Sequence, residues 1–314
     1  MTQQAVEQAN ARDFFSAAQV IIVAGKGGVG KTTVSAALGT LSARLGFETV
    51  VIDVEDRDDL GRCFGFSELN FEPTVAGPNL QLRSLGAEDA ATEYLKDQGL
   101  GRVLKLLRRA GSLLDTLTSL TPGLRGMLQL AKIRSIADAS PNAVIIVDAP
   151  AAGHAISFLR SPLGLREGIT AGPIHKQATA ASELLGDPDR TQVMLVTLAE
   201  DTPVQETIET AYALEEDLNI RLGPIVVNTT VPVIAGLGKA LSATAKKSSH
   251  KKQLAEAGDL RHQRQEHQRK QIDFLAQELP LPTVQLPELL TPSISKDELS
   301  ELADLLATQL RLMP

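Results

Sequence analysis

The chain has 314 residues and a formal net charge of −7, with 43% hydrophobic and 22% charged residues. This balance is typical of a soluble globular protein, and an acidic chain is not expected to bind nucleic acid by neutralising phosphates. The single cysteine, Cys63, excludes an intrachain disulfide and any metal cluster that needs several thiolates from one chain. We recognise neither a signal peptide nor a membrane-spanning stretch, and we expect a cytoplasmic protein.

Short runs rich in β-branched residues recur along the chain and predict buried strands. The five strong runs end at Gly25, Val54, Pro150, Ala199 and Asn228. Weaker strands are expected within residues 79–86 and 282–287. Because helical stretches lie between the runs, we predict an α/β fold with a doubly wound, mostly parallel sheet flanked by helices.

The first run leads into GKGGVGKTT at residues 25–33, and an amphipathic helical stretch follows. This segment fits G-x4-G-K-[ST] in the strand-to-helix context that a phosphate-binding loop (P-loop) requires, although a glycine-rich turn without a ligand is the alternative. We expect Lys31 to hold the β and γ phosphates and the Thr32 hydroxyl to coordinate Mg²⁺. The nucleotide-binding residues predicted here are Gly25, Gly27, Gly28, Val29, Gly30, Lys31, Thr32 and Thr33.

KGGVGKT at residues 26–32 resembles the deviant Walker A motif of dimeric ATPases that position division sites, segregate plasmids, reduce nitrogen, pump arsenite or target tail-anchored proteins. The resemblance implies ATP as the nucleotide. It also implies that Lys26 is catalytic, reaching across a dimer interface to the partner's nucleotide so that hydrolysis depends on dimerisation. From the residues alone, Lys26 could instead be a solvated surface charge.

Two aspartates end strong runs. Asp148 follows an apolar run, where a carboxylate can accept from Thr32 or from a Mg²⁺-bound water. The stretch DAPAAGH at residues 148–154 resembles switch II of the arsenical-pump and tail-anchored-protein-targeting ATPases, which implies that Gly153 donates its N–H to the γ-phosphate. At Asp53 the same family has the aspartate that orients the attacking water. An acidic, solvated loop over a strand end is the alternative for Asp53.

Two later motifs suggest the base side of the nucleotide. Residues 225–228, IVVN, resemble the family's V-V-N, which implies that Asn228 lies at the adenine, whose edge suits an amide. A turn-forming asparagine at a strand end is equally compatible with the sequence. Pro287 falls where the family's adenine-side loop lies. Residues 121–133 and 172–175 look most like the family's actinobacterial branch, which implies a homodimer or a heterodimer with a paralogous ATPase subunit.

We predict one P-loop ATPase domain over residues 19–314, preceded by an N-terminal extension at residues 1–18. Within the domain we expect an inserted, Leu-rich helical region at about 87–140 and a polar, mobile segment at about 236–262. A helix is expected at residues 272–279 and a closing helix at 295–312.

Two functions remain open. In one, an anion-pump or targeting-like ATPase uses the helices of residues 87–140 as an apolar groove for a client transmembrane helix or membrane-protein partner. In the other, a regulatory or partner-activating ATPase subunit has no groove, and those helices pack on the sheet or at a subunit interface. An exposed apolar patch would favour the first function and buried leucines the second. Both functions need ATP and Mg²⁺.

Overall fold

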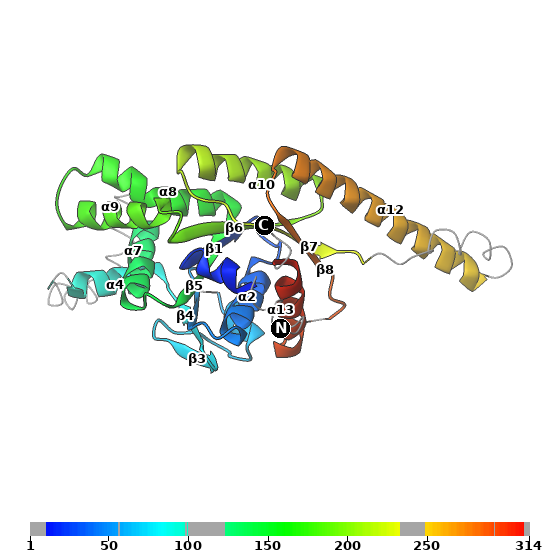
Figure 1. The fold of residues 1–314 in the computed structure, drawn as a ribbon, viewed down its shortest axis with the longest axis horizontal. Helices are drawn as coiled ribbons and strands as arrows, with labels where there is room; N and C mark the ends of the chain where they lie inside the picture. Colours follow the sequence, from blue (N-terminus) through cyan, green and yellow to red (C-terminus); the bar gives the residue numbers. More distant parts are fainter. Residues whose placement is uncertain are drawn as a thin grey trace, which may run out of the picture.

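The computed structural model describes residues 11–55, 57–97, 99, 123–232, 249–291 and 293–310. Within these ranges, eight strands form one sheet in the order β3-β4-β2-β5-β1-β6-β7-β8 (Figure 1). The strands are β1 Val20–Gly25, β2 Thr49–Asp53, β3 Thr74–Gly77, β4 Leu80–Ser84, β5 Val144–Ala151, β6 Thr191–Leu198, β7 Ile225–Thr230 and β8 Thr283–Pro287. Neighbouring strands are parallel except for β3 and β4. The predicted doubly wound α/β fold is confirmed.

Helices cover both faces of this sheet. They are α2 Lys31–Arg44, α3 Asp59–Cys63, α4 Ala87–Asp97, α7 Leu124–Ala139, α8 Ala152–Gly168, α9 Pro173–Gly186, α10 Asp201–Tyr212, the π-helix η1 Ala213–Asp217, α12 Ser249–Glu278 and α13 Lys296–Leu310. None of the described helices is both long and apolar enough to cross a membrane.

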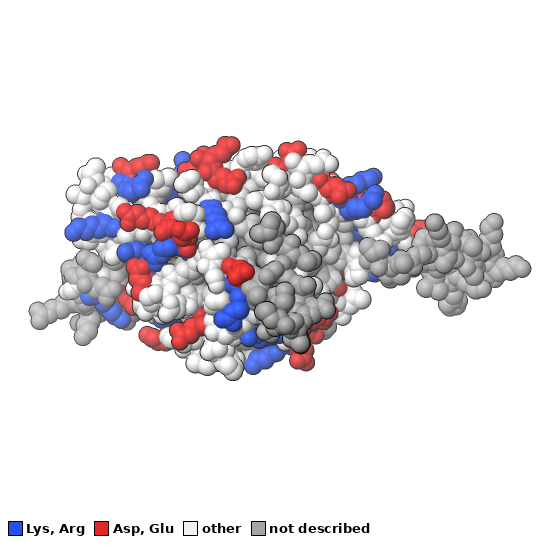
Figure 2. Space-filling view, viewed as in Figure 1, with Lys and Arg blue, Asp and Glu red and all other residues white. Residues whose placement is uncertain are grey.

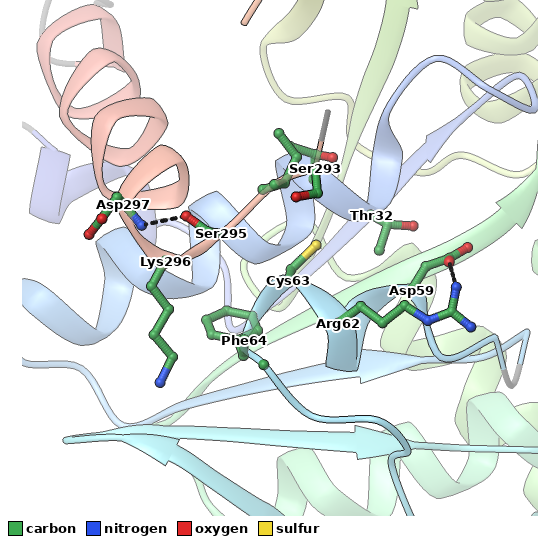
Figure 3. Close-up of a pocket in the computed structure, with 12 residues that line it drawn as sticks. Thr32, Asp59, Arg62, Cys63, Phe64, Ser293, Ser295, Lys296 and Asp297 are labelled. Atoms are coloured by element: carbon green, nitrogen blue, oxygen red, sulfur yellow. Dashed lines mark hydrogen bonds and ion pairs between the residues drawn. The ribbon is translucent and has the colours of Figure 1, made fainter. Parts of the chain in front are cut away.

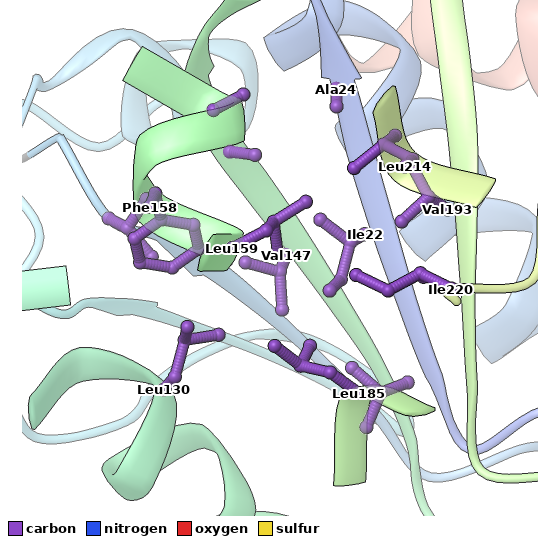
Figure 4. Packing of buried hydrophobic residues seen from close by; sticks show 14 of the residues in the cluster. Ile22, Ala24, Leu130, Val147, Phe158, Leu159, Leu185, Val193, Leu214 and Ile220 are labelled. Atoms are coloured by element: carbon purple, nitrogen blue, oxygen red, sulfur yellow. The ribbon is translucent and has the colours of Figure 1, made fainter. Parts of the chain in front are cut away.

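The alternation of side chains along β1 divides the core into two layers. Ile22 and Ala24 face the layer formed by α4, α7, α8, α9 and α10, part of which is shown in Figure 4. Ile21 and Val23 face the opposite layer, where α2 and α13 pack against each other. Because successive residues of a strand point to opposite faces, one continuous apolar run can serve both layers.

The sequence did not predict β3. This four-residue strand pairs antiparallel with β4 at the edge of the sheet, and Val75 within it is 71% exposed. Pro78 and Asn79 connect the two strands, and Asn79 adopts a positive φ of 57°. A strand that buries so little apolar surface has no hydrophobic pattern by which to be recognised.

The segment predicted as inserted at 87–140 contributes α4 and α7, which pack together; residues 98 and 100–122 lie outside the described part. The polar segment predicted at 236–262 is described from residue 249 onward. There it forms the first half of α12, a 30-residue helix that extends away from the sheet in Figure 1. The helix therefore begins well before the predicted 272–279, and Leu275 in its last turns anchors it in the core.

Charged side chains of both signs are interspersed on the face shown in Figure 2. Lysine and arginine do not gather there into one basic stripe. The described residues of that face therefore do not form the basic stripe that is typical of nucleic-acid-binding proteins. The expected absence of a nucleic-acid partner stays a prediction.

The N-terminal boundary differs from the prediction. Residues 11–16 are helical, and Ala11, Phe15 and Ala18 are buried in the layer that contains α2. The Phe15 ring lies 6.0 Å from that of Phe47. Residues 11–18 are thus part of the domain rather than an extension, because their apolar side chains complete its core; residues 1–10 lie outside the described part.

This packing predicts that Phe15→Ala lowers the free energy of unfolding by about 3 kcal/mol, since a buried aromatic side chain is replaced by a cavity. Urea unfolding of the variant measures the loss. Ser16→Ala, an exposed neighbour, is the control and should change stability by less than about 0.5 kcal/mol. Equal stability of the two variants would mean that this segment does not belong to the core.

Candidate nucleotide-binding site

The loop of residues 25–33 joins β1 to α2, and two of its glycines have no room for a side chain. A Cβ at Gly25 would lie 2.2 Å from the Val196 carbonyl oxygen, and one at Gly30 would lie 2.2 Å from Nδ2 of Asn228. Gly30 also has a φ of 91°. Gly28 is exposed, has a φ of 84° and faces open space. The loop backbone is therefore braced underneath and accessible on top, as a phosphate cradle requires.

Lys31 lies beneath this cradle at the start of α2 and is only 8% exposed. Its Nζ donates a hydrogen bond to the Lys26 carbonyl oxygen at 3.3 Å. Burial lowers the pKa of Lys31, while the nearby Asp148 carboxyl acts in the opposite direction. An ammonium group with so little water around it gains strongly from a bound anion.

Thr32 and Asp148 form the oxygen-rich part of the site. The Thr32 hydroxyl donates to Asp148 Oδ2 at 2.6 Å, and the Ser35 hydroxyl donates to Oδ1 at 3.2 Å. Burial raises the pKa of Asp148 to about 6, although both hydrogen bonds and Lys31 favour the charged form. A hydroxyl and a carboxylate side by side are hard oxygen donors of the kind that Mg²⁺ prefers.

The Thr32 hydroxyl and the Asp148 carboxylate suit a metal ion that takes most of its other ligands from bound phosphates and water. Among the described residues there is no group of three or more His, Cys, Asp or Glu side chains that could hold a metal ion. Mg²⁺ is usually bound through one or two protein oxygens together with phosphates and water. Thr32 and Asp148 therefore remain the predicted metal residues.

Asp53 lies beside Asp148 because β2 and β5 pair in register at these two residues. It is 4% exposed, and its carboxylate accepts hydrogen bonds from the backbone N–H groups of Glu55 at 2.9 Å and Arg57 at 3.0 Å. Asp53 itself is therefore not solvated, whereas Arg57 and Asp59 in the segment that follows it are exposed. The role of Asp53 in orienting water stays a prediction.

Lys26 is not a free surface charge either. Its Nζ lies 2.7 Å from Oε1 of Glu206 in α10, and the two side chains are 39% and 37% exposed. From the sequence alone, no role is assigned to Glu206. No local pattern signals this pair, because its members are 180 residues apart.

Gly153 lies in the first turn of α8, is exposed and faces open space. The loop is close to this turn, since a Cβ at Gly27 would lie 3.7 Å from that of Ala151. The structure thus brings the turn that contains Gly153 to the edge of the loop. A hydrogen bond from the Gly153 N–H to a γ-phosphate stays a prediction.

Asn228 is only 7% exposed and lies below the loop. Its Nδ2 donates to the Val29 carbonyl oxygen at 2.9 Å, and its Oδ1 accepts from the Thr229 N–H at 2.9 Å. The amide therefore braces the loop. Pro287 ends β8 opposite Thr230. Adenine contacts by Asn228 and Pro287 stay predictions.

A cavity of about 900 Å³ opens beside Thr32 and Thr33 (Figure 3). Its other walls come from α3 with the two residues that follow it, and from residues 293–297 at the start of α13. Burial raises the pKa of the Cys63 thiol in this wall to about 11, so the thiol stays protonated and unreactive. The sequence alone predicts a helix from residue 295 but does not connect it with this site. The Ser295 N–H donates to the Glu298 carboxylate in a capping-box contact at the start of that helix.

The raised pKa of Asp148 yields a prediction for the protein without nucleotide and Mg²⁺. A carboxyl whose pKa is higher folded than unfolded destabilises the fold once pH exceeds the unfolded value, and fully above the folded one. Asp148→Asn should therefore raise the free energy of unfolding at pH 7.5 by about 2–3 kcal/mol, and the gain should shrink as pH falls from 6 to 4. Urea unfolding across this range measures it, and a constant gain would contradict the assignment.

Comparisons with known proteins agree with this geometry. Residues 18–177, about half of the chain, match the family model described as anion-transporting ATPase. This match includes the loop, Asp53, Asp148 and Gly153, but it ends before Asn228 and Pro287.

Individual relatives have related names. ATPase BagA of Mycobacterium tuberculosis is 31% identical over 229 residues, which cover 69% of this chain and 66% of that protein. The arsenical pump-driving ATPase of Acidiphilium multivorum is 25% identical over 245 residues, covering 70% and 40%. ATPase ASNA1 homolog 2 of Paramecium tetraurelia is 29% identical over 164 residues, covering 48% and 46%. The matches span at most about two thirds of these relatives. With the family model matched across the strand, loop and switch residues, the chain belongs to the anion-transporting ATPase family.

Proposed function

We propose that the chain binds Mg·ATP on the loop of residues 25–33 and hydrolyses it, with two subunits sharing the reaction. The observation that carries the proposal is the 2.6 Å hydrogen bond between Thr32 and Asp148 beside the buried Lys31. It unites a phosphate-binding cation with two metal-binding oxygens at the carboxyl edge of a parallel sheet, where ligands of such folds bind. Membership of an ATPase family supports the same reaction.

The loop residues divide the work of binding. Backbone N–H groups of the loop and the first turn of α2 would hold phosphate oxygens, and Lys31 would hold the β and γ phosphates. Thr32 and Asp148 would hold Mg²⁺. When bound, Mg²⁺ offsets the negative charge that develops on the phosphates during transfer.

Asp53 is the proposed water-positioning residue. Its carboxylate is aimed by the N–H groups of Glu55 and Arg57 and lies next to Asp148. Phosphoryl transfer passes through a loose transition state, so orienting the water matters more than a strong base. A carboxylate that is already fixed by two hydrogen bonds loses little entropy when it accepts one more from water.

The cavity beside Thr32 and Thr33 supports a place for the nucleoside. A nucleotide held by its phosphates at the start of α2 must extend its nucleoside into adjacent open space, and about 900 Å³ is available there. Pro287 leads through residues 288–291 toward the wall at 293–297. We propose that Asn228 and Pro287 contact the base.

A dimer is proposed because Lys26 is not needed to cradle phosphates within one subunit. As in ATPases with the same loop pattern, Lys26 would supply a positive charge to the partner's nucleotide. The partner is a second copy of the chain or a paralogous ATPase subunit. We place this reaction in the cytoplasm.

We propose an anion-pump or targeting-like ATPase, with a regulatory or partner-activating subunit as the alternative. The described part of the Leu-rich region packs its apolar side chains in the core; residues 100–122, which hold most of its leucines, lie outside the described part. In α7, apolar side chains point into the core, including Met127, Leu130 and Ile133, each at most 1% exposed. In α4, Ala90 and Ala91 are likewise buried. Within 87–97 and 123–140 no large hydrophobic residue is exposed. Relatives named as arsenical pump-driving ATPases are consistent with an ATPase that drives a separate pump.

Replacing each of the two loop lysines should impair a different step, ATP binding for Lys31 and hydrolysis for Lys26. Lys31→Ala should weaken ATP binding at least about tenfold, because the ligand loses its buried counter-charge. Lys26→Ala should leave binding within about twofold but lower turnover at least about a hundredfold, as loss of a trans-acting cation does in other NTPases. Equilibrium binding of a fluorescent ATP analogue and phosphate release measure the two effects.

Lys270→Ala, on the exposed face of α12, is the matched control and should change neither quantity. Phosphate release per chain should rise with protein concentration as light scattering detects a dimer. Normal turnover by Lys26→Ala would refute the shared reaction while leaving nucleotide binding at the loop intact.

A further inference from the structure

Lys26, which is proposed to reach the nucleotide of a second subunit, is held by an ion pair within its own subunit. Lys26 Nζ lies 2.7 Å from Glu206 Oε1, and the Lys26 carbonyl oxygen accepts a hydrogen bond from Lys31 Nζ at 3.3 Å. A continuous chain of contacts therefore links Glu206 through Lys26 to the phosphate-binding lysine. A nucleotide that draws Lys31 toward its phosphates must remove the second of these contacts.

Glu206 is the rigid member of the ion pair. It lies on α10, whose buried side chains Val204, Ile208 and Ala211 fix the helix against the core. Lys26 lies in the loop between the exposed Gly27 and the buried Gly25. A change of partner by Lys26 thus requires movement of the loop residue and not of the helix.

We propose that Glu206 is a positioning residue that holds Lys26 on its own subunit in the absence of nucleotide. The ion pair must break before Lys26 can reach the nucleotide of a second subunit. This inference rests on the proposed function, and it adds a regulatory element to it: Glu206 sets the protein concentration at which the subunits join and hydrolysis begins.

The exposure of the pair determines the size of the effect. Ion pairs that are more than one-third exposed are partly screened by water, and one such pair changes an equilibrium by about two- to fivefold. Two pairs break when two subunits exchange their lysines. Removing the charge of Glu206 should therefore lower the dissociation constant of the ATP-bound dimer by about four- to twenty-fivefold, and less at high salt.

Glu206→Gln removes the charge while keeping the shape of the side chain. Glu209→Gln, three residues further along α10, is the control, because Glu209 is exposed and its carboxylate accepts only a hydrogen bond from Gln205 among the side-chain contacts described for it. Thermal unfolding of both variants establishes that the fold is kept. Two measurements are then made: the acetylation rate of Lys26 without nucleotide, followed by mass spectrometry, and phosphate release as a function of protein concentration.

For Glu206→Gln we expect Lys26 to be acetylated about two- to fivefold faster than in the wild type, and the protein concentration for half-maximal turnover to fall by about four- to twenty-fivefold. Turnover at saturating protein should not fall, which separates positioning from a direct part in the chemistry. Glu209→Gln should match the wild type in all three quantities.

Two results overturn the inference and differ from each other. If Glu206→Gln leaves the acetylation rate and the half-maximal concentration unchanged, Glu206 does not hold Lys26, while the proposed shared reaction stands. If turnover of the wild type itself does not depend on protein concentration, the shared reaction fails and the role of Glu206 fails with it.

Discussion

The site depends on the register of the central parallel strands. β5 lies between β1 and β2, so that Asp148 is level with Val23 on one side and Asp53 on the other. On the far side of β1, Gly25 is level with Val196 of β6, and a Cβ at Gly25 would lie 2.2 Å from the Val196 carbonyl oxygen. Because carboxyl ends of parallel strands meet at one edge, four distant segments converge there. A shift of one residue in the pairing of β2 with β5 would turn Asp53 or Asp148 toward the opposite face.

Convergence at this edge has an energetic consequence. Asp148 is buried deeply enough that its pKa rises to about 6, and Lys31 is buried nearby with a lowered pKa. Two charged groups with little solvent destabilise the protein without ligand, and both are suited to partners that carry the opposite charge. The proposed Mg·ATP supplies a cation for one and phosphates for the other. The stability of the fold and its affinity for the proposed ligand are thus set by the same two side chains.

The ion pair between Lys26 and Glu206 is more exposed to water than the two buried side chains Lys31 and Asp148. Water reaches both of its members, so the contact is easily exchanged for another. The exposed ion pair between the loop lysine and the helix carboxylate is suited to breaking and re-forming. The hydrogen bond between Thr32 and the buried Asp148 is suited to a fixed arrangement. The surrounding helices support this division, since α2 and α10 are both fixed by buried side chains on their inner faces.

The sequence alone determined the sheet, the loop and the two aspartates, because each depends on local information: apolar runs, glycine spacing and position at a strand end. It did not predict β3, the packing of residues 11–18 or the early start of α12, because none of these has a strong local hydrophobic pattern. Only the tertiary structure decided the contact of Lys26 with Glu206, that of Asn228 with Val29, the place of Asp53 beside Asp148 and the walls of the cavity at residues 293–297. Those contacts join segments distant in sequence, and chain topology rather than local propensity brings such segments together.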